Sequence, residues 1–495
     1  MRNTTRTKAD LLQILFAISF SITLLIINII RIFNIPITID ENGYDPLDSY
    51  KVLLLDTPGK ANDHILHSVI RKFCIEHFSN NIFFYRVDSL VAQALFLLFS
   101  YLLCHSLFKN KYWMLLSFCL LNLISPFIFD FWGLSRGYAL SLAFMMMSIY
   151  YFFNYLNNKK ILLISLSLAA AILSVYSNFG YVNYFFSLAA VVCVRYIVFK
   201  KTTTKGQMVR ELSVLFIATS VLAILITQPL MNVYSNGEQF FLGSNGFLQD
   251  TVTTLVSDGL IIVNPTSLLP THIIIWLVLI TTFSGGIYWL YIYFKGHYYK
   301  QDPSIEAISG IILYLLLIIP VVSMIAQHIL FHINYLTDRA ALFFIILFIL
   351  HLTYWLYYLK AVIPKISVVI FTTIFLLASY NFCSKINLRS TLLWWFDADD
   401  LHVINRIANE TKNKHHKIKI RVTWFFVPSF NYDFEQKYPG KFYPIADIRD
   451  TAGKDTTYDY YYISSPEVTD KLAEKYALDT SFVGGNFLLF KKKED

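Results

Sequence analysis

Apolar stretches of about twenty residues recur along this chain and are separated by short polar connections. A helix of that length crosses the hydrocarbon core of a bilayer, so each stretch predicts one membrane-spanning helix. The pattern therefore predicts an α-helical polytopic membrane protein, and the mean hydropathy of +0.51 agrees with it. We expect eleven spans, near residues 10–32, 88–108, 111–128, 136–156, 160–177, 180–199, 211–230, 271–294, 305–329, 339–359 and 364–384.

The connections between these spans alternate between basic and base-poor. Because Lys and Arg gather in cytoplasmic connections, the alternation predicts a cytoplasmic N-terminus and an outward C-terminus. The long connection at 231–270 holds no Lys or Arg and is expected outside. The formal charge of +8 is then explained by the inner connections, and no nucleic-acid partner is expected. Those connections carry Lys109 and Lys111; Lys159 and Lys160; Lys200, Lys201, Lys205 and Arg210; Lys295 and Lys300; Lys360 and Lys365.

Three hydrophilic regions are expected on the outer side: 33–87, 231–270 and the tail at 385–495. In the first, "NDHILHSVIRKFCIEHF" has helical spacing of apolar residues and predicts a helix along the membrane surface. The tail reads as a small α/β domain after a transmembrane domain at 1–384. Within it we expect helices at "DLHVINRIANETK" and "SPEVTDKLAEKYA", the second capped by Ser465, and strands at "KIKIRVTWFFV", "YDYYYIS" and "GNFLLFKK".

Acidic residues crowd directly after the first span, in "ITIDENGYDPLDSY". Asp40 and Glu41 are an adjacent pair that could act as a general base toward a hydroxyl or hold a divalent cation. The plainer interpretation of this stretch is a solvated acidic loop.

A second polar cluster begins the surface helix, where Asn62, Asp63, His64 and His67 lie within two turns. One carboxylate and two imidazoles could bind a metal ion, although a single helical turn offers few ligands. Alternatively, Asp63 is the N-cap of the helix.

Arginines stand at the outer ends of three inward-running spans: Arg86, Arg136 and Arg339. Each lies near a helix N-terminus, where backbone N–H groups and a guanidinium together suit a phosphate. Snorkelling to the membrane surface or pairing, for example of Arg86 with Asp88 and of Arg339 with Asp338, is the alternative. The same outer turns hold Asp130, the aromatics Trp132 and Tyr138, and the histidines His328 and His332, which are expected on one helical face.

Three short motifs in this order resemble the GT-C superfamily of membrane glycosyltransferases: "IDE" at 39–41, "NDHIL" at 62–66 and "SRGYAL" at 135–140. The chain is most similar to the bacterial protein O-mannosyltransferase and aminoarabinose transferase type. The resemblance implies an outward cavity that receives a polyprenyl-phosphate-linked sugar. It implies that Asp40 is the essential acid, with Glu41 beside it and Asp130 as a second acidic position. The sequence departs from the family pattern at Asp63, where similar proteins often have a second Asn.

The hypothesis drawn from this resemblance is an inverting transfer to an acceptor hydroxyl on a lipid, glycan or protein. Asp40 would deprotonate that hydroxyl, alone or through a bound Mg²⁺ or Mn²⁺, while Arg136, Arg339, Arg86 and His332 would bind the donor phosphate. Asn62, Asp63, His64 and Tyr138 would assist the sugar, acceptor or metal. An O-antigen polymerase or ligase and a polytopic transporter are the rivals. The Lys-, Ile-, Asn- and Phe-rich composition suggests a bacterial inner-membrane protein with a periplasmic active site and tail.

Overall fold

The computed structural model describes residues 8–42, 50, 64–198, 204–235, 243–260, 268–298, 304–414, 416–445, 457–482 and 486–493. Its contacts divide the chain into two compact units. The helical unit comprises Met1–Asn28, Asp48–Phe78 and Phe84–Ile386. The C-terminal unit comprises Ile29–Leu47, Ser79–Phe83 and Asn387–Asp495, so it includes short segments from the start of the chain. The tail predicted at 385–495 does not include these early segments, and its boundary near residue 385 stays a prediction.

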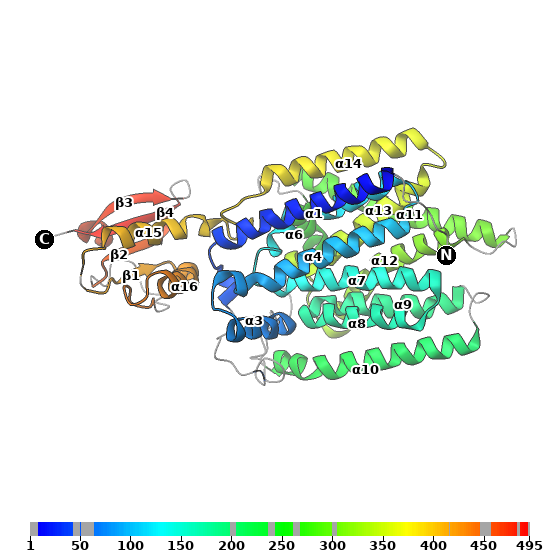
Figure 1. The fold of residues 1–495 in the computed structure, drawn as a ribbon, viewed down its shortest axis with the longest axis horizontal. Helices are drawn as coiled ribbons and strands as arrows, with labels where there is room; N and C mark the ends of the chain where they lie inside the picture. Colours follow the sequence, from blue (N-terminus) through cyan, green and yellow to red (C-terminus); the bar gives the residue numbers. More distant parts are fainter. Residues whose placement is uncertain are drawn as a thin grey trace. The chain divides into compact units, whose positions relative to one another are not determined.

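Every apolar stretch that predicted a span contains a helix (Figure 1), but the stretch at 111–128 is divided between α5 Lys111–Leu123 and α6 Pro126–Phe131. In the described residues, eight helices are long and apolar enough to cross a membrane, and three apolar helices, α5, α8 and α13, are shorter. The helices are α1 Lys8–Asn34, α4 Ile82–Leu107, α5 Lys111–Leu123, α7 Gly137–Asn158, α8 Ile161–Ser177, α9 Val182–Val198, α10 Lys205–Ser235, α11 Leu268–Tyr298, α12 Ile305–Phe331, α13 Phe343–Leu359 and α14 Pro364–Lys385.

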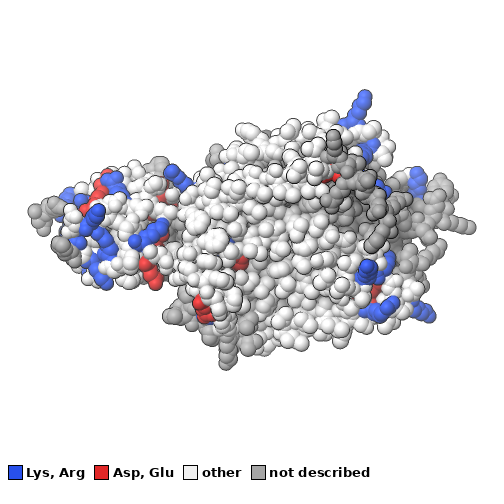
Figure 2. Space-filling model, in the orientation of Figure 1, with Lys and Arg blue, Asp and Glu red and all other residues white. Residues whose placement is uncertain are grey.

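Uncharged side chains cover the middle of the visible face of the helical unit (Figure 2). Lys and Arg gather at one end of that unit. A face of this kind suits a lipid environment, in which exposed charge is costly. The fold is that of a helical membrane protein with a small C-terminal sheet domain, while the predicted eleven crossings and their direction remain predictions.

Buried serines hold neighbouring helices of the helical unit together. Ser148 of α7 and Ser167 of α8 share a hydrogen bond of 3.3 Å, and Tyr184 of α9 donates to Ser148 at 2.8 Å. Ser174 of α8 donates to the Ser141 carbonyl of α7 at 2.8 Å. Small polar residues suit such interfaces because they let helix backbones approach closely and satisfy each other inside an apolar environment.

Short helical elements connect the spans at the side that the sequence predicts to be outside. They are α3 Ile65–His77, α6 Pro126–Phe131, η2 Phe179–Tyr181, two π-helical turns at Phe247–Val252 and Leu255–Leu260, and η6 Asp338–Ala341. The expected surface helix is α3, and its N-cap position is His64 without a side-chain cap. Asn62 and Asp63 lie outside the described residues, as do Asp45 and Asp48.

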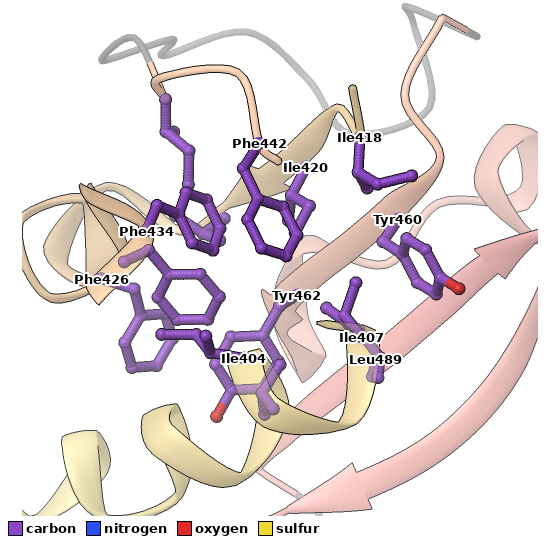
Figure 3. Packing of buried hydrophobic residues seen from close by; sticks show 14 of the residues in the cluster. Ile404, Ile407, Ile418, Ile420, Phe426, Phe434, Phe442, Tyr460, Tyr462 and Leu489 are labelled. Carbon is purple, nitrogen blue, oxygen red and sulfur yellow. The ribbon is translucent and has the colours of Figure 1, made fainter. Parts of the chain in front are cut away.

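The C-terminal unit contains a four-stranded sheet with the order β1-β2-β4-β3. β1 Ile420–Val422 pairs parallel to β2 Tyr460–Ser464, while β4 Phe487–Lys492 pairs antiparallel with both β2 and β3 Tyr476–Phe482. Helices α15 Asp400–Glu410 and α16 Val427–Lys437 pack together. Figure 3 shows isoleucines of α15, β1 and the residues before it meeting aromatic rings of α16 and β2 in one core.

The α/β prediction for the tail is confirmed in class but differs in three elements. β1 is shorter than predicted, because a 3₁₀ turn at Trp424–Phe426 and then α16 follow it. The helix predicted from Ser465 is shorter, since it is α17 Asp470–Lys475 and its cap is Thr469, whose hydroxyl accepts from Leu472 N–H. The residues after Lys475 form strand β3, which the sequence reading missed.

Candidate functional site

The acidic pair after the first span lies on a 3₁₀ turn, η1 Ile39–Asn42, in the C-terminal unit. Glu41 is 1% exposed, and its carboxylate accepts from Thr38 N–H at 2.9 Å while its own N–H donates to Thr38 O at 3.0 Å. Glu41 therefore stabilises the turn through its two hydrogen bonds with Thr38. Asp40 is half-buried beside it, and η1 packs against α16 of the same unit. This geometry gives the two adjacent acids different surroundings and leaves Asp40 as the better candidate for chemistry.

His64 lies at the head of α3 in the helical unit, with 4% of its surface exposed. Its Nδ1 is 2.9 Å from the carbonyl oxygen of Ser177, which can only accept, so Nδ1 carries the proton. Burial lowers the pKa of this imidazole well below its usual range, and the charges of Arg136, His67 and Arg339 lower it further. The ring is therefore neutral near pH 7, and its Nε2 is a hydrogen-bond acceptor.

Gly137, the first residue of α7, makes this position of His64 possible. A Cβ atom at Gly137 would lie 2.2 Å from the Ser177 carbonyl oxygen and 2.7 Å from His64 Cβ. Neither the backbone oxygen nor the imidazole stem can move away easily. The glycine of the "SRGYAL" motif is thus required by close packing between α3, α7 and the end of α8.

Two of the predicted phosphate-binding arginines act on the same imidazole. Arg136 is the N-cap residue of α7, and Arg339 lies in η6, just before α13. Both guanidinium groups lower the pKa of His64, although they are about 200 residues apart in the sequence. Tyr138 completes the cluster: its ring centroid is 4.6 Å from that of His64 and 5.6 Å from the Arg136 guanidinium.

The remaining predicted residues of the helical unit take separate positions. Asp130 is buried on α6, and its neighbour Phe131 contacts Tyr138 with ring centroids 4.8 Å apart. Arg86 is fully buried on α4. Tyr138, with Trp132, is buried and is not an exposed interfacial aromatic.

His332 does not share a helical face with His328. It ends α12 in a left-handed conformation, with φ of 54°, and is exposed. His328 instead bonds through Nδ1 to the Ile333 carbonyl at 2.9 Å and stacks on Tyr335. The predicted pair of histidines on one face is therefore wrong, because the helix stops before the second one.

A buried hydrogen-bond chain at this site escaped the sequence reading. The carboxylate of Asp88 on α4 bonds to Nδ1 of His67 on α3, and Nε2 of His67 lies 3.0 Å from the hydroxyl of Ser135. Each member stands close in sequence to a candidate residue: His67 to His64, Asp88 to Arg86, and Ser135 to Arg136. A signal existed, since a carboxylate within a span needs a partner, but the sequence offered Arg86 as an alternative partner for Asp88 and gave no indication of His67.

The turn between α8 and α9 was also missed. Asn178 is the N-cap of η2, and its Oδ1 accepts from Gly180 N–H at 2.9 Å. Gly180 approaches the Ala340 carbonyl of η6, because a Cβ there would lie 3.0 Å from that oxygen. Tyr181 packs on Phe343 at the start of α13, with ring centroids 5.2 Å apart. Polar residues in "SNFGY" between two apolar stretches were the available signal.

The described residues contain no group of three or more His, Cys, Asp or Glu side chains that could hold a metal ion. Both imidazoles of the "NDHILH" segment are bonded through Nδ1 to other groups, and Asp63 lies outside the description. On η1, one carboxylate is already used by Thr38 N–H. These residues do not make an all-protein metal site. Mg²⁺ would fit only if substrate phosphate oxygens completed its coordination at Asp40.

An apolar pocket of about 490 Å³ opens in the helical unit between α11, α12, α13 and the two π-helical turns. Its walls include Leu255, Val278, Phe283, Leu317 and Phe344, and Tyr335 lies at its edge. The lining is almost wholly hydrocarbon and aromatic. Such a surface suits an acyl or isoprenoid chain.

No protein-family model matches the sequence, and no curated protein matches it. Two solved structures are similar in fold. Oligosaccharyltransferase of Archaeoglobus fulgidus, in complex with Zn and sulfate, gives a TM-score of 0.44 at 12% identity over 90% of this chain and 67% of that one. ArnT from Cupriavidus metallidurans, bound to undecaprenyl phosphate, gives a TM-score of 0.41 at 11% identity over 96% of this chain and 97% of that one. Both likenesses have TM-scores below 0.5 and concern the fold alone.

Proposed function

We propose that this protein is an integral membrane glycosyltransferase that moves a sugar from a polyprenyl-phosphate donor to an acceptor hydroxyl. The observation that carries the proposal is the cluster of His64, Tyr138 and Arg136 at the N-terminus of α7, where the charge of Arg339 also lowers the pKa of His64. A helix N-terminus with two guanidinium groups favours a phosphate, while Nε2 of a neutral imidazole accepts a hydrogen bond from a hydroxyl. The site thus suits a molecule that has both groups.

In this mechanism the donor phosphate binds at Arg136 and Arg339, and the acceptor hydroxyl attacks C1 of the sugar. The bond between C1 and the phosphate oxygen breaks as the new C1–O bond forms, so the configuration at C1 inverts. The hydroxyl proton passes to a general base, the role that the resemblance of the "IDE" motif implies for Asp40. The arginines stabilise the negative charge that grows on the departing phosphate, and such preorganised charge is often the largest contribution to catalysis.

The apolar pocket between α11, α12 and α13 would hold part of the polyprenyl chain. Its wall includes Tyr335, which stacks on His328 and lies four residues before Arg339. One continuous substrate could therefore place its chain on hydrocarbon and its phosphate near η6. A bacterial inner membrane, with the site on the periplasmic side, is the compartment that this proposal implies.

Binding of undecaprenyl phosphate to the purified protein tests the phosphate site. Arg136→Gln and Arg339→Gln should each weaken binding at least tenfold, since a charge-assisted hydrogen bond contributes about 1.5–3 kcal/mol. The matched control is Arg406→Gln in α15, an exposed arginine that pairs with Asp479 and Glu410 and should leave binding unchanged. Equal affinity of all four proteins would contradict the proposed site.

A further inference from the structure

We propose that His64, Asn178 and Tyr181 form a recognition site for a sugar hydroxyl, an inference that rests on the proposed function. Each of these residues has one buried polar atom without a hydrogen-bond partner among the described residues: His64 Nε2, Asn178 Nδ2 and Tyr181 Oη. All three side chains are more than nine-tenths buried. Buried polar atoms are rarely left without partners, so atoms of this kind point to a ligand.

The chemical role of the first two atoms follows from bonds that their neighbours make. The Ser177 carbonyl fixes the proton of His64 on Nδ1, so Nε2 presents a lone pair. Gly180 N–H donates to Oδ1 of Asn178, so the amide is oriented with Nδ2 as the remaining donor. One residue therefore offers an acceptor and the other a donor.

The two residues belong to one local arrangement, because His64 bonds to Ser177 and Asn178 is the next residue. Tyr181 follows in the same turn and packs on Phe343. Gly180 of that turn approaches the Ala340 carbonyl, which is adjacent to Arg339. The hydroxyl-recognition site is thus linked by direct contacts to the segment that carries a proposed phosphate-binding arginine.

The mixture of donor and acceptor selects the class of ligand. An anion would need donors alone, and a cation would need acceptors alone. A hydroxyl donates its proton to one group and accepts from another, so it matches His64 Nε2 with Asn178 Nδ2, and Tyr181 can serve either role. We therefore assign this site to a hydroxyl on the sugar ring of the donor.

Two conservative variants remove the ligand contact while they keep the fold. Asn178→Asp retains an oxygen that accepts from Gly180 N–H but loses the donor. Tyr181→Phe removes only a hydroxyl that has no partner in the described chain. The matched control is Tyr184→Phe, one turn away, whose hydroxyl donates to Ser148 at 2.8 Å. The control should lower the melting temperature without changing ligand affinity.

Affinities of the purified protein for undecaprenyl phosphate, for its glucosyl, mannosyl and galactosyl forms, and for their monodeoxy analogues test the inference. We expect one sugar form to bind about tenfold tighter than undecaprenyl phosphate, because its hydroxyl satisfies buried groups. Deleting one ring hydroxyl, or introducing Asn178→Asp or Tyr181→Phe, should remove that gain.

Three results would overturn the inference. Full sugar-dependent gain in both variants would show that these residues do not contact the sugar. If the protein bound undecaprenyl phosphate but no sugar form bound more tightly, the hydroxyl-recognition site would be contradicted and the proposed phosphate site would stand. Binding of neither the phosphate nor any sugar form would remove the proposed function as well.

Discussion

At the scale of single residues, the candidate site depends on atoms whose positions are fixed by close neighbours. His64 owes its tautomer to the Ser177 carbonyl and its place to the missing side chain of Gly137. The sequence indicated His64 as a candidate, but it could not indicate the bond to a residue more than 100 positions away. The sequence therefore identifies His64 by residue type, whereas the protonation and the orientation of its ring follow only from the fold.

Gly137→Ala should impair both stability and activity. The added methyl would overlap the Ser177 oxygen and the His64 stem, and overpacking of this kind costs about 1–3 kcal/mol. Displacing His64 should also lower transfer activity at least tenfold, measured together with the melting temperature. The control is Gly206→Ala in α10, where no atom lies within 4 Å of the new Cβ. Equal behaviour of the two variants would contradict the packing account.

Asp400 provides a second test at this scale, in the C-terminal unit. Burial, followed by the charges of Asp397, Asp433 and Asp399, raises the pKa of this carboxyl well above its ordinary value. An acid with a raised folded pKa contributes full stability below its unfolded pKa of about 3.9, and that stability falls as pH rises toward the folded pKa.

Asp400→Asn removes this titration, so the variant should melt at a higher temperature than the parent. The difference should grow between pH 5 and pH 8, by about 1.4 kcal/mol per pH unit until the folded pKa is reached. Thermal melts across this pH range, followed by tryptophan fluorescence, measure it. The exposed Asp470→Asn is the control. A lower melting temperature for Asp400→Asn at pH 8 would contradict the assignment.

At the scale of elements, length and apolar content were sufficient for the spans and insufficient for the tail. Each predicted span contains a helix because a helix satisfies its own backbone groups within an apolar environment. In the tail, the aromatic run before Pro428 was read as a strand, but Pro428 lies in the first turn of α16. The sequence did not predict β3, because α17 ends at Lys475 and the following residues form a strand only by pairing with β4. No local sequence pattern indicates that pairing.

The hydrogen-bond chain Asp88–His67–Ser135 joins α4, α3 and the turn before α7, and we expect it to position Arg136 and His64. Ser135→Ala and Asp88→Asn should each raise the KM for the donor, and the double variant should be non-additive by more than 0.5 kcal/mol, since both act on one network. Ser148→Ala, in the same helix α7 as Gly137 and Tyr138, also breaks a buried hydrogen bond and is the control.

Kinetics of the four proteins decide the question. The control should lose stability comparably but keep the parent's KM. Additive effects of Ser135→Ala and Asp88→Asn, or a raised KM in Ser148→Ala, would show that the chain only stabilises the fold.

At the scale of the whole molecule, the candidate residues lie in the two units separately. Asp40 and Glu41 belong to the C-terminal unit, whereas His64, Asp130, Arg136 and Arg339 belong to the helical unit. The sequence could order these segments along the chain and predict one common outer side from the distribution of Lys and Arg. It could not place the turn at 177–181 in the site, because that turn is linked to His64 and η6 only through folding.

We propose that Asp40 is required for the transfer of sugar from a polyprenyl-phosphate donor. The most direct measurement is mass spectrometry of polyprenyl-phosphate sugars in cells that carry Asp40→Asn at normal membrane levels, with surface glycans profiled in parallel. Glu76→Gln, an exposed carboxylate paired with Lys72, is the control. We predict that the donor accumulates and one glycan modification disappears in Asp40→Asn alone. Unchanged glycans without donor accumulation would contradict the account.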